Sequence, residues 1–152
     1  GTAGWHTASM CGRSPVVSFA HGGGVAVALA APDGRPLVGI DIERIGPRSA
    51  KYESVAFAPH ERELVAGLQD EAQREWHLRM WCAKEAVGKA IGRGLAVGLH
   101  ALQITEARPS DGGVRLIVTD AVGAECPVAA SRDLFTFTAR DGDYVSSAIA
   151  TA

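Results

Sequence analysis

The sequence predicts a single α+β domain in which an antiparallel sheet packs against one long helix. Three observations support this class. Short apolar runs, partly β-branched, fill both ends of the chain, glycine-rich turns join them, and the middle of the chain carries a helical apolar period. A length of 152 residues, with 47% hydrophobic and 21% charged residues, is sufficient for one compact core.

The first elements expected are strands. Apolar runs at 16–20 and 25–30 flank His21-Gly22-Gly23-Gly24, which predicts a hairpin with a glycine turn. Pro32-Asp33-Gly34 then leads into a run at 37–42, so three antiparallel strands in succession are expected.

Helices follow in the middle of the chain. Pro59, with two acidic residues close behind it, predicts a helix start, and this helix is expected to run to about Gln69. A longer amphipathic helix is predicted from Asp70 to Ile91, because apolar residues recur there at intervals of three and four. These residues are Trp76, Met80, Ala83, Val87 and Ala90, and Gly92 and Gly94 close the helix.

The last third of the chain again predicts strands, which places them after the helices rather than between them. They are expected at 102–105, 114–118, 134–139 and 144–149, with Asp-Gly turns at 111–113 and 141–143. This order favours a layered α+β fold over a doubly wound parallel sheet. Residues 1–13, rich in Gly, Ser and Thr, are interpreted as an N-terminal loop or domain boundary, and residues 14–152 as the folded domain.

Composition excludes several functional classes. A formal charge of −2 provides no basic field for nucleic acid, so any phosphate affinity must be local. The three cysteines, Cys11, Cys82 and Cys126, are widely spaced and odd in number, which favours a reducing, cytoplasmic setting over a disulfide framework or a zinc site. We find no membrane-spanning apolar run and no signal peptide pattern.

Two segments carry candidate chemistry. Asp41 and Glu43 are two residues apart in an apolar run, so on a strand both side chains point from one face. Glu85 and Lys89 are four apart on the long helix, with Lys84 beside them. Such a set suits a magnesium-bound pyrophosphate. Ordinary solvent-facing strand residues and a surface helix pair contributing about 0.2–0.5 kcal/mol remain the competing interpretations.

These segments resemble motifs of the 4'-phosphopantetheinyl transferases. Gly39-Ile40-Asp41 is similar to the family's Gly-x-Asp, and Trp81-Cys82-Ala83-Lys84-Glu85-Ala86-Val87-Gly88-Lys89 to its lysine–glutamate helix motif. Ser18-Phe19-Ala20-His21-Gly22 resembles the family's histidine segment, and its position before Asp41 matches the surfactin type, as do Glu43 and Phe57-Ala58-Pro59-His60-Glu61. Gly92-Arg93-Gly94-Leu95 resembles the family's Gly-x-Gly-Leu ending.

The resemblance implies magnesium-dependent transfer of 4'-phosphopantetheine from coenzyme A to a serine of an acyl or peptidyl carrier protein, with 3',5'-ADP leaving, as in a holo-[acyl-carrier-protein] synthase of polyketide or fatty acid biosynthesis. It implies Asp41, Glu43 and Glu85 as magnesium ligands and Lys84 and Lys89 as catalytic, phosphate-neutralising lysines. His21 would contact the nucleotide 3'-phosphate, with Arg13 a weaker candidate, and Glu61 would assist the metal or the base. Glu85, or a water on the metal held by Glu43, would take the serine proton.

The resemblance also has a large gap. Surfactin-type enzymes fold as two similar halves, one of which helps to bind the nucleotide, and only a few residues precede the histidine segment here. The chain is therefore interpreted either as a domain of a larger protein, such as a polyketide synthase with an integrated transferase, or as a subunit that completes its site by self-association. A non-catalytic module that binds coenzyme A or a carrier domain is the alternative function. His21 is also explained as a turn residue, and Glu61 by the helix dipole.

Overall fold

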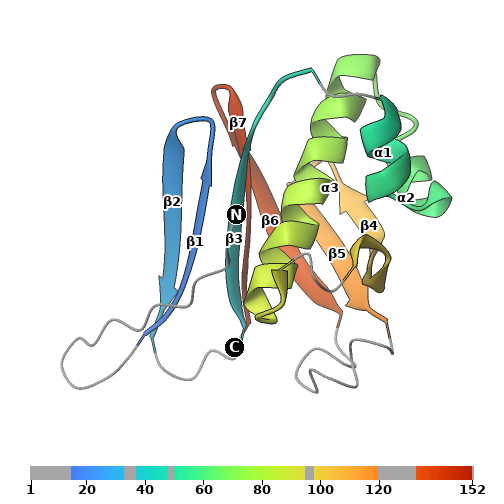
Figure 1. Cartoon of the computed structure of the whole chain (residues 1–152). Coiled ribbons are helices and arrows are strands. Elements are labelled where there is room, and N and C mark those ends of the chain that lie inside the picture. Colours follow the sequence, from blue (N-terminus) through green and yellow to red (C-terminus); the bar gives the residue numbers. More distant parts are fainter. Residues whose placement is uncertain (1–14, 33–36, 48–49, 95–97, 120–132, 152) are drawn as a thin grey trace.

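The fold was described from a computed structural model, which describes residues 15–32, 37–47, 50–94, 98–119 and 133–151. It is the predicted α+β arrangement of antiparallel sheets packed against a long helix (Figure 1). The strands and helices occur in the order β1 (Val16–Gly22), β2 (Val25–Ala31), β3 (Val38–Arg44), α1 (Ala50–Ala56), α2 (Pro59–Glu63), α3 (Asp70–Ala90), β4 (Leu102–Arg108), β5 (Gly113–Val118), β6 (Leu134–Asp141) and β7 (Tyr144–Ala150), with a short 3-10 helix at Leu99–Ala101.

The strands form two sheets. Strands β1 and β2 make a two-stranded hairpin, and the other five make an antiparallel sheet in the order β3-β7-β6-β5-β4. The expected succession of three antiparallel strands is therefore wrong at its third member, because β3 pairs with β7, with Asp41 opposite Ser147. Strand β1 nevertheless packs beside β3, and the Ile40 backbone N–H donates to Ser18 Oγ at 3.1 Å.

The helical segment differs from prediction in two respects. Helix α1 was not predicted, since seven residues are too few to display a helical period. Helix α2 ends at Glu63 rather than near Gln69, and the chain continues through turns to the start of α3 at Asp70. None of the helices in the described ranges is long and apolar enough to cross a membrane.

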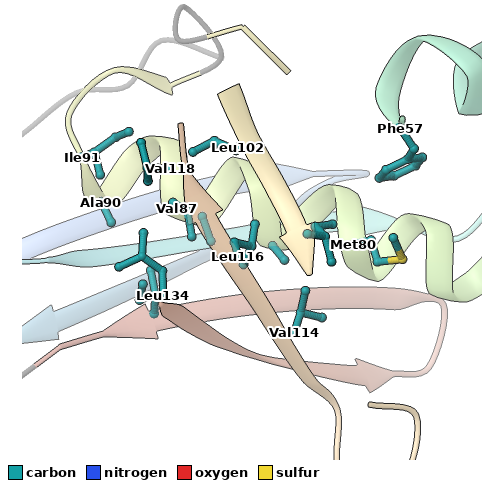
Figure 2. Close-up of a cluster of buried hydrophobic side chains, with 14 of the residues drawn as sticks. Phe57, Met80, Val87, Ala90, Ile91, Leu102, Val114, Leu116, Val118 and Leu134 are labelled. Atoms are coloured by element: carbon teal, nitrogen blue, oxygen red, sulfur yellow. The ribbon is translucent and has the colours of Figure 1, made fainter. Parts of the chain in front are cut away.

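The hydrophobic core lies between α3 and the five-stranded sheet (Figure 2). Met80 and Val87 of α3 are fully buried and pack with Ile104, Val114 and Leu116 of the sheet. Their alternation along the strands and their three- and four-residue spacing along the helix are the patterns that predicted both elements. The core therefore fixes which face of α3 turns towards the sheet.

Glycine 39 sets how closely α3 approaches β3. A Cβ atom at this position would collide with the carbonyl oxygen of Ala86 and would lie 3.0 Å from the Ala90 Cβ. The helix backbone thus rests directly on the strand backbone at Gly39, which explains why a glycine is needed there. Two residues further along β3, on the same face, is Asp41.

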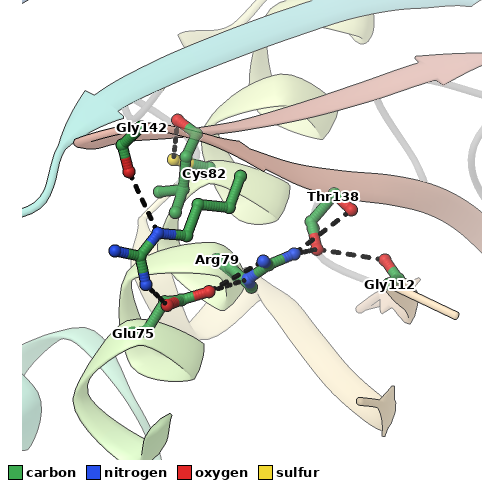
Figure 3. Close-up of polar contacts among 8 residues, drawn as sticks. Glu75, Arg79, Cys82, Gly112, Thr138 and Gly142 are labelled. Carbon is green, nitrogen blue, oxygen red and sulfur yellow. Dashed lines mark hydrogen bonds and ion pairs between the residues drawn. The ribbon is translucent and has the colours of Figure 1, made fainter. Parts of the chain in front are cut away.

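A polar network holds the N-terminal half of α3 against β6 (Figure 3). Arg79 pairs with Glu75 at 2.7 Å and donates to the carbonyl oxygen and Oγ1 of Thr138, at 3.3 and 3.1 Å. Glu75 also accepts from Arg140 at 2.6 Å. These contacts join the helix to β6, the central strand of the sheet, which is separated from β3 by β7.

Candidate functional site

A small pocket lies where β1, β3 and α3 meet. Its volume is about 130 Å³, and the side chains lining it include three carboxylates. Its lining residues are Phe19, Ala20 and His21 from β1, Asp41 and Glu43 from β3, and Glu85 and Lys89 from α3. The structure thus brings five of the predicted site residues to one place from segments more than sixty positions apart in the sequence.

Asp41 is the most enclosed acid of the pocket, at 6% exposure. Its Oδ1 accepts a hydrogen bond from Lys89 Nζ at 2.8 Å, and the same ammonium donates to the Ile40 carbonyl oxygen at 3.2 Å. Lys89 therefore reaches across to β3. Burial raises the pKa of Asp41 above its ordinary value, and the Lys89 ammonium opposes that shift.

The second oxygen of Asp41, Oδ2, is buried without a hydrogen-bond partner. The Cys82 thiol donates to the Val145 carbonyl oxygen at 3.8 Å and is also a hydrogen-bonding neighbour of Asp41 that lowers the pKa of this carboxyl. A thiol is a weak donor, so it does not satisfy a buried carboxylate. An oxygen left in this state is suited to a cation.

Glu85 has the most altered acidity in the pocket. Burial, followed by the nearby negative charge of Asp41, raises its pKa from 4.5 to about 7, and Lys89 opposes this shift. The charge of Glu43 acts in the same direction as Asp41. Three acids that repel one another in a partly enclosed space form an electrostatically unfavourable cluster, which a bound cation would relieve.

Strand β1 supplies the third wall of the pocket. His21 is exposed at its rim and Phe19, 49% exposed, lies two residues earlier on the same face of the strand. Phe19 was not among the residues that the sequence indicated as functional. The signal for it was available, because a residue two positions from His21 on a strand must share its side.

Lys84 and Glu61 lie elsewhere. Lys84 Nζ forms an ion pair of 2.8 Å with Glu61 beneath α3, where the side-chain exposures are 0% and 1%. Neither residue lines the pocket that holds Asp41, Glu43 and Glu85. Arg13, the weaker candidate for the nucleotide phosphate, lies outside the described residues.

The donor set fits magnesium in type. Magnesium prefers about six oxygen ligands at roughly 2.0–2.1 Å and usually retains several waters. Asp41, Glu43 and Glu85 supply carboxylate oxygens, and Asp41 Oδ2 is available. Within the described ranges, no three acidic, histidine or cysteine side chains converge closely enough to enclose an ion as they stand. Waters and substrate oxygens would therefore complete the coordination.

A larger hollow of about 230 Å³ lies beside the first half of α3. It is lined by residues such as Tyr52, Glu53, His77 and Leu78. Arg140 and Glu75 form an ion pair of 2.6 Å there, and His77 Nδ1 lies 3.2 Å from Glu53. We place the candidate site in the smaller pocket instead, because its acids outnumber its single lysine.

The stability of the metal-free chain should depend on pH through Glu85. A carboxyl whose pKa is raised on folding binds its proton more tightly in the folded state, so stability falls as pH rises from about 4.5 to about 7. We expect Mg²⁺ to raise the unfolding temperature more at pH 8 than at pH 5, where Glu85 is protonated. Thermal unfolding at both pH values, with and without Mg²⁺, measures this. An equal Mg²⁺ effect at the two values would contradict it.

Comparison with known proteins finds one family model and two relatives that each match part of this chain. A family model described as ACPS, the 4'-phosphopantetheinyl transferase superfamily, matches residues 37–140. The protein slr0495 of Synechocystis sp., named provisionally as a 4'-phosphopantetheinyl transferase, is 31% identical over 90 residues, which cover 58% of this chain and 36% of that protein. The 4'-phosphopantetheinyl transferase HetI of Nostoc sp. is 41% identical over 73 residues, or 46% of this chain and 30% of HetI. The matched segments thus span about a third of these relatives' lengths.

Proposed function

Since the chain belongs to the 4'-phosphopantetheinyl transferase superfamily, we propose that it transfers 4'-phosphopantetheine from coenzyme A to a serine of an acyl or peptidyl carrier protein. The observation that supports this most is the pocket in which Asp41, Glu43 and Glu85 gather around Lys89. In the proposed reaction the serine oxygen forms a bond to the pantetheine-side phosphorus, the bridging P–O bond breaks, and 3',5'-ADP leaves with that electron pair.

The pocket residues divide this chemistry between them. Asp41, Glu43 and Glu85 would hold Mg²⁺, which, when bound, neutralises the charge that develops on the pyrophosphate. Lys89 is already fixed by Asp41 and Ile40, so its ammonium is oriented before substrate arrives. Glu85, or a water on the metal held by Glu43, is the proposed acceptor of the serine proton, because both carboxylates line the pocket and a carboxylate or a metal-bound water can act as a general base.

The finer assignments follow from the resemblance. We propose that the carrier belongs to polyketide or fatty acid biosynthesis, so that the activity is that of a holo-[acyl-carrier-protein] synthase. A cytoplasmic location is proposed because Cys82 is buried as a free thiol. A preceding, covalently linked domain or a second copy of the chain is proposed to complete the nucleotide pocket.

A non-catalytic module that binds coenzyme A or a carrier domain is the second candidate. The observation that favours it is the limited coverage of the relatives, 36% and 30% of their lengths. The three carboxylates favour the enzyme, because binding alone does not require a metal set beside the phosphates.

Calorimetry of ligand binding tests the proposed site. We expect coenzyme A to bind more tightly in Mg²⁺ than in EDTA, and Asp41→Asn to remove that difference. Equal binding of coenzyme A with and without Mg²⁺ would count against magnesium in the site. Exposed Asp143→Asn, on the β6–β7 turn and not among the residues that line the pocket, is the matched control and should behave as wild type.

The role of His21 has its own test. Dephospho-coenzyme A lacks the 3'-phosphate, so a histidine that contacts this phosphate should discriminate between the two nucleotides. We expect His21→Ala to weaken coenzyme A binding about tenfold, the effect of losing roughly 1.4 kcal/mol, and to leave dephospho-coenzyme A binding unchanged. Parallel weakening of both ligands would refute a 3'-phosphate contact.

A further inference from the structure

The least expected feature of α3 is a lysine buried beneath it. Lys84 has 0% exposure, and its Nζ lies 2.8 Å from each of the two carboxylate oxygens of Glu61, which is itself 1% exposed. Burying two charges costs several kcal/mol each unless their partners are nearly ideal. Burial accordingly lowers the pKa of Lys84, and Glu61 opposes that shift.

Backbone groups form further hydrogen bonds with both members of this ion pair. Lys84 Nζ also donates to the Ala56 carbonyl oxygen at 3.1 Å, at the end of α1. Glu61 Oε2 accepts from the Ala58 backbone N–H at 2.8 Å, and Oε1 from the Ile104 N–H of β4 at 2.7 Å. One ion pair therefore connects α3, the end of α1, the start of α2 and an edge strand of the main sheet.

Stability alone does not explain such a pair. Apolar residues of similar volume in place of a buried ion pair are often neutral or stabilising. Apolar packing, however, does not fix the orientation of one element on another. Van der Waals contacts tolerate small slides and rotations, whereas hydrogen bonds to fixed backbone groups weaken steeply when distance or angle changes.

The position of the pair along α3 is specific. Lys84 immediately precedes Glu85, so the two side chains are separated by about 100° around the helix and about 1.5 Å along it. One points beneath the helix to Glu61, and the other faces the pocket with Asp41 and Glu43. Of the other polar contacts of α3, Arg79 on Thr138 lies five residues earlier, towards the opposite end of the helix from the pocket. Lys89 donates hydrogen bonds to Asp41 and Ile40 at the pocket itself.

We propose that Lys84 and Glu61 are positioning residues. They fix the rotation of α3 about its axis and its position along that axis, so that Glu85 faces Asp41 and Glu43. This inference rests on the proposed function, since it assigns these carboxylates a shared magnesium ion. It replaces the expected roles of Lys84 as a phosphate-neutralising lysine and of Glu61 as an assistant to the metal or base. Both residues act through Glu85 and touch no substrate.

The double variant Lys84→Met/Glu61→Gln tests the proposal, because it removes both charges and nearly preserves both volumes. We expect it to fold with a lowered unfolding temperature, because removal of the two charges is close to neutral but the backbone groups of Ala56 and of Ala58 or Ile104 lose a partner. Its affinity for Mg²⁺, measured calorimetrically without substrates, should fall about tenfold or more, the range found when groups that orient metal ligands are removed. Turnover should fall through kcat, with KM for coenzyme A little changed.

The matched control is Arg115→Met/Glu106→Gln, which removes another ion pair, of 3.1 Å, from the opposite face of the sheet at 38% and 42% exposure. It should bind Mg²⁺ as wild type does. If the first double variant does not fold, Glu61→Asp alone serves, because it retains the carboxylate charge facing Lys84 and only shortens the side chain by one methylene. Wild-type Mg²⁺ affinity in the folded variant would overturn the positioning role alone. Failure of the unmodified chain to bind Mg²⁺ would overturn the proposed site, and the positioning role with it.

Discussion

Replacement of Glu85 by Gln should lower the rate of phosphopantetheine transfer by about 100-fold or more, because it removes both a magnesium ligand and a proposed proton acceptor. The unfolding temperature should stay the same or rise at pH 8. In the native pocket the ionised carboxylate is disfavoured by burial and by Asp41, as its pKa of about 7 indicates, and a neutral amide of the same shape relieves both.

The control for Glu85→Gln is Glu63→Gln, an exposed acid at the end of α2 outside the pocket. It should transfer at the wild-type rate. Single-turnover rates with saturating coenzyme A separate the chemical step from binding. A Glu85→Gln protein that turns over at the wild-type rate would exclude Glu85 as both ligand and base.

Replacement of Gly39 by Ala should destabilise the fold by about 3 kcal/mol or more, at the upper end of what overpacking costs. The added Cβ would meet the carbonyl oxygen of Ala86 and the Cβ of Ala90, and a helix backbone resting on a strand backbone cannot move aside locally. Strand β3 would be displaced from α3, and Asp41 would move with it. The variant should therefore also lose Mg²⁺ affinity.

Gly46→Ala is the matched control for Gly39→Ala. Gly46 follows β3, and a Cβ there would meet no atom within 4 Å, so its stability change should stay within about 0.5 kcal/mol. Urea unfolding of both variants measures the contrast. Equal midpoints for Gly39→Ala and wild type would show that α3 does not rest on β3 at this residue.

The local patterns of the sequence were sufficient for most of the fold. The period-two runs and the three- and four-residue spacing on α3 predicted strands and helix where the structure has them. The pairing of β3 with β7 could not be predicted in this way, because the two strands are about a hundred residues apart and no local turn joins them. Helix α1 is held by tertiary packing of Ala56 and Tyr52 rather than by any period of its own.

The site was less predictable, and Lys84 shows why. The spacing from Met80 to Lys84 and on to Val87 places this lysine on the buried face of α3. The interpretation from sequence followed the charge of the residue instead and assigned it to the phosphates. A surface pair of Lys89 with Glu85 one turn away was the competing interpretation, yet Lys89 Nζ lies 2.8 Å from Asp41 on another element. Residue spacing predicts neighbours along a helix, but the choice between them depends on what the helix packs against.

The central claim is that this chain modifies a carrier protein, and the mass of the carrier tests it most directly. An unmodified acyl carrier protein is incubated with the chain at high concentration, coenzyme A and Mg²⁺, and is then weighed by mass spectrometry. We predict a phosphopantetheine adduct on one serine, which appears in Mg²⁺ and not in EDTA. An unmodified carrier, from a chain that still binds coenzyme A tightly, would contradict catalysis by this chain and support the binding module.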